Sequence, residues 1–109
     1  NARLLAHLRA GGVSTFMYGG NANLYHMGVT EYPHFLDMLA ALAEESDWMI
    51  PSVGGDYGKA MDQVRVARAY EFPTVMVLPQ RFPVAPGGVA TGLRRIADAY
   101  GRPIVAYVK

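Results

Sequence analysis

Four short apolar segments recur along the chain, and this repetition restricts the fold more than any other feature. They cover residues 12–17 (GVSTFM), 48–53 (WMIPSV), 74–78 (TVMVL) and 103–108 (PIVAYV). Each is apolar over most of its length, which is typical of strands buried on both faces of a parallel sheet. Their starts lie roughly 26 to 36 residues apart, which is the size of one strand–helix unit.

Helical patterns fill the intervals between these segments. Residues 30–44 begin with Thr30 as the expected N-cap and Pro33 in the first turn, and apolar residues then recur with helical spacing. Three further helices are expected, at residues 3–10, from about residue 60 to 70, and at residues 89–100 with a stop at Gly101. The alternation predicts an α/β fold with a parallel sheet, either an open doubly wound sheet or a (β/α)8 TIM barrel.

The chain has 109 residues, which is enough for one domain and less than a complete barrel. It begins with a helical pattern and closes on an apolar segment with no helix after it. Because parallel strands need cover on both faces, we expect residues 1–109 to be a single domain fragment of about four strand–helix units. A complete barrel needs about 250 residues.

The composition restricts which molecules and ions the chain is expected to bind. Ten basic and nine acidic residues leave a formal charge of +1, which offers no electrostatic footprint for nucleic acid or an anionic membrane. The chain has no cysteine, its three histidines lack a metal-binding spacing, and no apolar run approaches the about 20 residues of a membrane span. We therefore expect a cytoplasmic globular protein without a metal or cofactor, and without nucleic-acid or membrane partners.

Glycine-rich stretches follow the first three apolar segments. They are residues 18–28 (YGGNANLYHMG), 54–58 (GGDYG) and 79–88 (PQRFPVAPGG). In both parallel architectures the functional groups lie at the carboxyl ends of the strands. Glycines there allow backbone N–H groups to approach a carboxylate or phosphate, although ordinary turn chemistry also explains them. None of the stretches reads as G-x-G-x-x-G or as a Walker loop, so a nucleotide site has little support.

Several side chains near these ends are candidates for chemistry. The phenol of Tyr107 can relay a proton or be a satisfied core group, and Lys109 points to the same side of the strand. Arg81 can bind a carboxylate with two hydrogen bonds, or be solvated. Three aromatic residues can line a pocket or pack beneath the loops, namely Tyr25, Tyr57 and Phe82.

Four stretches together resemble the dihydrodipicolinate synthase and N-acetylneuraminate lyase family of Schiff-base (class I) aldolases, which are TIM barrels. They are residues 12–24 (GVSTFMYGGNANL), 50–55 (IPSVGG), 74–79 (TVMVLP) and 102–107 (RPIVAY), in the order of the family's strands two to five. The resemblance implies a lyase that acts on pyruvate or a related 2-oxo acid through a lysine imine. That lysine lies on the sixth strand, outside this chain, and the longer protein is expected to be a homo-oligomer.

The resemblance also implies roles for individual residues. Tyr107 matches the tyrosine that relays protons beside the imine. Tyr18, Gly19, Gly20 and Asn21 match the loop whose backbone N–H groups hold the substrate carboxylate. Arg81 is the candidate for a distal substrate carboxylate.

Other positions depart from the family pattern. Met17 and Tyr18 replace a pair of hydroxyl residues, Gly20 replaces a glutamate, and Gln80 and Arg81 stand where the synthase branch has tyrosines. A thioether cannot replace a hydroxyl in a proton relay. The alternative is therefore a non-catalytic ligand-binding or regulatory barrel. A phosphate-binding domain of another family, using residues 86–92 (PGGVATG) at a helix start, is a third reading.

Overall fold

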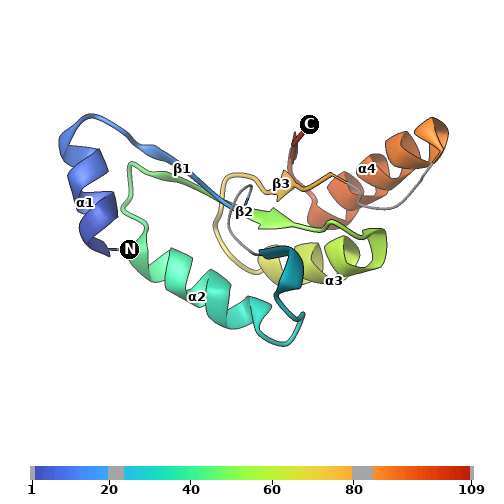
Figure 1. Ribbon diagram of the computed structural model, residues 1–109, viewed down its shortest axis with the longest axis horizontal. Coiled ribbons are helices and arrows are strands. Elements are labelled where there is room, and N and C mark those ends of the chain that lie inside the picture. The colour runs from blue at the N-terminus through green and yellow to red at the C-terminus, as the bar shows by residue number, and fades with distance from the viewer. Residues whose placement is uncertain (1, 20–23, 80–84, 109) are drawn as a thin grey trace.

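The computed structural model describes residues 2–19, 24–79 and 85–108, and these form a four-stranded parallel sheet with helices between the strands (Figure 1). The strands are β1 (Thr15–Tyr18), β2 (Trp48–Val53), β3 (Met76–Val77) and β4 (Val105–Ala106). The helices are α1 (Ala2–Ala10), the 3-10 helix η1 (Leu24–His26), α2 (Tyr32–Leu42), α3 (Tyr57–Ala67) and α4 (Pro86–Tyr100). The predicted α/β order is confirmed.

The strands lie side by side in chain order, β1-β2-β3-β4, and every neighbouring pair is parallel. Met17 lies opposite Ile50, Ser52 opposite Met76, and Val77 opposite Ala106. Because all strands run the same way, their carboxyl ends form one edge of the sheet. The loops that follow them therefore meet there.

The two faces of the sheet carry separate apolar clusters. The outer face packs on the helices, and its strand residues in the large core are Phe16, Met49, Val53 and Val77. Buried helix residues such as Leu36, Leu39, Val64 and Ile96 complete that layer. The inner face carries a smaller cluster of Ile50, Met76 and Leu78, against which Tyr25 and Tyr107 pack. Alternate strand residues thus serve different cores, as the two-residue period of a strand requires.

The prediction that all four strands are buried on both faces is wrong for β1 and β4. Phe16 in β1 is buried, but the neighbouring Met17 is 60% exposed. Both residues of β4, Val105 and Ala106, are exposed. Helices α1 to α4 pack on the outer face, whereas Tyr25, from η1, and Tyr107 provide the apolar cover of the inner face within the described residues.

Strand β2 covers the predicted segment 48–53, whereas β1, β3 and β4 are shorter than the apolar segments that predicted them. Residues 11–13 close the end of α1, because the Gly12 N–H donates to Arg9 O at 2.9 Å and the Val13 N–H to Leu8 O at 3.0 Å. The flanks of β3 and β4 still bond to their neighbours. Leu78 N–H donates to Val53 O at 2.9 Å, and Tyr107 N–H donates to Val77 O at 3.0 Å.

Helix boundaries also differ from expectation. Glu31, not Thr30, occupies the N-cap position of α2, and Pro33 lies in the first turn as predicted. Helix α3 ends at Ala67, three residues before the expected Tyr70, because the chain closes in tighter turns with Tyr70 N–H donating to Ala67 O at 3.0 Å. The stop after α4 is confirmed. None of the helices within the described ranges is both long and apolar enough to cross a membrane.

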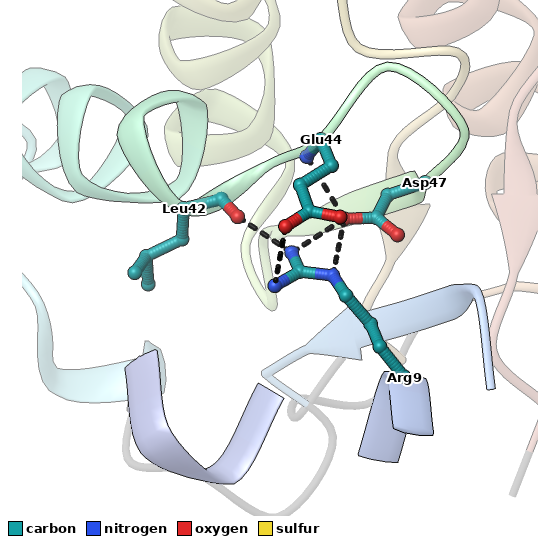
Figure 2. Close-up of polar contacts among 4 residues, drawn as sticks. All are labelled: Arg9, Leu42, Glu44 and Asp47. Carbon is teal, nitrogen blue, oxygen red and sulfur yellow. Dashed lines mark hydrogen bonds and ion pairs between the residues drawn. The ribbon is translucent and has the colours of Figure 1, made fainter. Parts of the chain in front are cut away.

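An ion-pair network ties α1 to the loop between α2 and β2, at the amino end of the sheet (Figure 2). Arg9 donates to Asp47 Oδ2 from Nε at 3.0 Å and from Nη2 at 2.5 Å, and to Leu42 O at 2.6 Å. The exposed Glu44 forms a further ion pair, with its Oε1 atom 3.5 Å from Nη1 of Arg9. The hydrogen bonds from Arg9 hold the pKa of the Asp47 carboxyl below its ordinary value, so this pair is charged at neutral pH.

Candidate functional site

The carboxyl edge of the sheet brings together parts of the chain that are far apart in sequence. Gly19 follows β1, Gly54 and Gly55 follow β2, Pro79 follows β3 by two residues, and Tyr107 follows β4 directly. Four of these five positions are glycine or proline, so backbone rather than large side chains dominates this edge.

Two phenols lie on the inner face at this edge. Tyr107 and Tyr25 both pack, partly buried, against the cluster of Ile50, Met76 and Leu78. Tyr107 comes from the end of β4, whereas Tyr25 comes from η1 in the loop after β1. At the carboxyl ends of the strands, two side chains with hydroxyl groups therefore pack against an apolar cluster.

Gly19 has a packing reason to be glycine. Its φ is +132°, and a Cβ there would overlap Ser52 Oγ and lie 2.7 Å from Leu24 Cδ1. Ser52 Oγ donates a hydrogen bond to the Tyr18 carbonyl, which holds β1 and β2 together at this point. The close approach of strand and loop therefore requires glycine here.

The side chain of Tyr18 lies on the outer face, away from Tyr107. Its ring meets the Phe35 ring edge-on, with centroids 6.4 Å apart, within the layer between sheet and helices. Met17, one residue earlier, is the β1 side chain opposite Ile50 on the inner face. Any role of Tyr18 at the inner face thus falls to its backbone.

Five further candidate residues lie outside the described residues, namely Gly20, Asn21, Arg81, Phe82 and Lys109. The contacts of Gly20, Asn21 and Arg81 with a substrate carboxylate stay predictions. The stretch of residues 86–92 lies wholly within α4 and forms its first turns.

Sequence reasoning left Tyr25 undecided and gave Lys59 no role. Lys59, in the first turn of α3, donates from Nζ to the carbonyl of Tyr25 at 2.8 Å and to that of Leu24 at 3.3 Å. Gln63, buried on the same helix, accepts a 2.7 Å hydrogen bond from Gly54 N–H. The Lys59 contacts join two separate strand–helix units across 34 and 35 residues, so no local pattern could have identified them. The Gln63 contact stays within the unit of β2 and α3, nine residues along the chain.

Across residues 2–19, 24–79 and 85–108, no three His, Asp or Glu side chains gather as metal ligands would. The histidines His7, His26 and His34 are all exposed and lie on different helices.

No protein-family model and no curated protein sequence matches this chain. Among solved structures, the chain is similar to a sialic acid aldolase from Ruminococcus gnavus, a catalytic lysine mutant, with a TM-score of 0.84 and 17% sequence identity. The match covers 99% of this chain and 37% of the aldolase. The chain has the fold of part of an aldolase TIM barrel.

In the barrel fold, the inner cluster belongs to the barrel interior and the helices form the outer ring. Active sites of TIM-barrel enzymes lie at the carboxyl ends of the strands. The edge that carries Gly19, Gly55, Tyr25 and Tyr107 is that end.

A cleft of about 530 Å³ opens at the other end of the barrel strands. It lies between the ends of α2 and α3 and the start of β2, and its lining includes Glu44, Glu45, Asp47, Tyr70 and Glu71. Its most buried acid, Asp47, is already paired with Arg9. Residues at this end of a TIM barrel stabilise the fold, whereas active sites lie at the opposite end. We therefore place the candidate site at the carboxyl edge.

Proposed function

We propose that this chain supplies part of the substrate site of a Schiff-base aldolase, a lyase that acts on pyruvate or a related 2-oxo acid. One observation carries the proposal: Tyr107 lies on the inner face at the carboxyl edge of a fold shared with an aldolase barrel. Because the chain spans 37% of that aldolase, the complete site includes residues from the rest of the longer protein.

In this proposal each group has one task. A lysine outside the chain forms the imine with the 2-oxo carbon, and the Tyr107 phenol passes a proton to or from the reacting atoms. Backbone N–H groups of residues 18–21 hold the carboxylate, and Arg81 binds a second carboxylate further out.

Lys59 is not the imine-forming lysine. A nucleophilic amine must lose its proton and turn its lone pair toward the substrate. Lys59 Nζ instead donates to two backbone carbonyls from the helix side of the loop. The sequence has one other lysine, Lys109.

Borohydride trapping of the full-length protein tests the proposal. Incubation with pyruvate and borohydride should add one reduced pyruvyl group, located by mass spectrometry on a lysine outside residues 1–109. Absence of the adduct in a folded, full-length protein would overturn the proposal.

Tyr107→Phe tests the role of the phenol. We expect the adduct to form still, while turnover falls by about 10²–10⁴-fold because the proton relay is lost. Tyr57→Phe is the matched control, since Tyr57 is exposed at the start of α3, and it should leave turnover unchanged.

A second candidate function is ligand binding without catalysis. Met17 favours it, because this thioether occupies the inner face of β1 where a hydroxyl would be needed to extend a proton relay. This candidate predicts that pyruvate raises the melting temperature without leaving an adduct after borohydride.

A further inference from the structure

The segment η1 (Leu24–His26) is fastened at the carboxyl edge by elements that are distant in sequence. Lys59 on α3 donates to the carbonyls of Leu24 and Tyr25, at 3.3 and 2.8 Å. Leu24 is buried in the outer core, close to Gly19. A three-residue helix has little stability of its own, so these contacts determine where its side chains lie.

The ring of Tyr25 sits tightly against the backbone after β2. A Cβ on Gly55 would lie 2.7 Å from Tyr25 Cε1 and 2.8 Å from Pro79 O. Only a glycine at position 55 allows the backbone to approach the Tyr25 ring and the Pro79 carbonyl this closely. The ring also packs against the inner cluster on which Tyr107 packs.

Lys59 occupies a position where a cation is otherwise unfavourable. It is the third residue of α3, and the positive end of the helix dipole lies in this first turn. The two carbonyl oxygens of η1 compensate the charge. The contacts of Lys59 with η1, and not its place in the helix, therefore account for a lysine at this position.

We propose that Tyr25 is a substrate-contacting residue of this site, and that Lys59 is the positioning residue that holds Tyr25 beside Tyr107. The inference rests on the proposed function, because the substrate is the 2-oxo acid that reaches Tyr107. A molecule that binds to the inner face at this edge would contact both rings, because they pack against the same apolar cluster.

The test uses full-length protein and pyruvate as the probe, because pyruvate labelling requires no knowledge of a second substrate. The half-saturating pyruvate concentration and the maximal rate of borohydride-trapped labelling are measured separately. Lys59→Met should raise the half-saturating concentration about tenfold and keep the adduct on the same lysine, since a small misplacement of a contact residue weakens binding strongly. Lys59→Arg should restore most of the loss.

A double-mutant comparison separates positioning from a general effect on folding. In a Tyr25→Ala background, Lys59→Met should add little, because Lys59 acts through Tyr25. Gly55→Ala leaves Lys59 in place but displaces the same ring and the backbone at Pro79, so it should raise the half-saturating concentration at least as much. Arg65→Met, at an exposed cation on the same helix, is the matched control and should change nothing.

The outcomes distinguish the two proposals. If the wild-type protein forms no adduct, the proposed function fails. If the adduct forms and Tyr25→Ala and Lys59→Met both leave the half-saturating concentration at the wild-type value, only the present inference fails. An undiminished effect of Lys59→Met in the Tyr25→Ala background would also overturn it, because the lysine would then act independently of Tyr25.

Discussion

The carboxylate of Asp47 is almost entirely withdrawn from water, with 1% of its side chain exposed, yet it is charged. Arg9 reaches it from α1, and the backbone N–H of Glu44 also donates to it at 2.9 Å (Figure 2). The Arg9 guanidinium also lies 5.5 Å from the centre of the Phe16 ring. One residue pair therefore joins α1, β1 and the loop before β2.

Asp47→Asn should lower the melting temperature at neutral pH and weaken the response of stability to acid. The pKa of Asp47 is lowered in the folded state, so its contribution is present above the unfolded value of about 4 and is lost as pH falls through the folded value. Thermal melts from pH 7 to pH 3 measure this. Asp62→Asn, in the exposed Arg65 pair, should change stability by no more than about 0.5 kcal/mol at any of these pH values.

At the scale of elements, α4 shows that the same residue type has opposite effects at the two ends of a helix. Gly101, the C-cap, has φ +76°, ψ 11°, and its N–H donates to Ala97 O at 2.9 Å. Gly88, in the first turn, has helical backbone and nothing within 4 Å of the Cβ position. The left-handed conformation requires glycine at position 101, whereas no steric contact requires glycine at position 88.

The two alanine substitutions should therefore have opposite signs. Gly101→Ala should destabilise the protein by about 1 kcal/mol, the lower end of the steric penalty of a left-handed residue. Gly88→Ala should stabilise it by about 0.5 kcal/mol, because alanine loses less conformational entropy in a helix. Urea titration of both variants measures the effect, and an equal effect of the two would contradict the assignment of Gly101 as the helix stop.

At the scale of the whole molecule, part of the inner face is open to water. Trp48 and Met17 are 56% and 60% exposed, and Val105, opposite Met76, is 37% exposed. The fold is elongated, with extents of 43 × 27 × 24 Å, and α1 and α4 lie at opposite ends of its long axis (Figure 1). Exposed apolar side chains on a parallel sheet favour association with another apolar surface.

Residues 1–109 produced alone should therefore self-associate. Light scattering should show a mass above that of one chain, and the fluorescence of Trp48, the single tryptophan, should shift to the blue as concentration rises. Met17→Glu should reduce the association. Met38→Glu, on the exposed side of α2, is the matched control and should leave it unchanged. A monomer at every concentration would contradict this prediction.

Local patterns determined the elements. The apolar segments, the helical spacing from Phe35 onward and the stop at Gly101 are properties of neighbouring residues, so the α/β order and the parallel sheet could be predicted from the sequence. The resemblance to aldolases in four stretches, in register, also predicted the barrel fold that the structural comparison shows. Strand and helix ends were less predictable, because they depend on which backbone groups find partners.

Only the tertiary structure decided which side chains meet. A strand places successive residues on opposite faces, so a shift of one residue exchanges Met17 and Tyr18 between the barrel interior and the helix layer, and composition cannot decide between them. Tyr25 and Tyr107 pack against the same inner cluster, and Lys59 contacts the loop after β1 across 34 residues of the chain. The sequence thus determined that the elements form and in what order, while the packing of distant units decided which groups make the site.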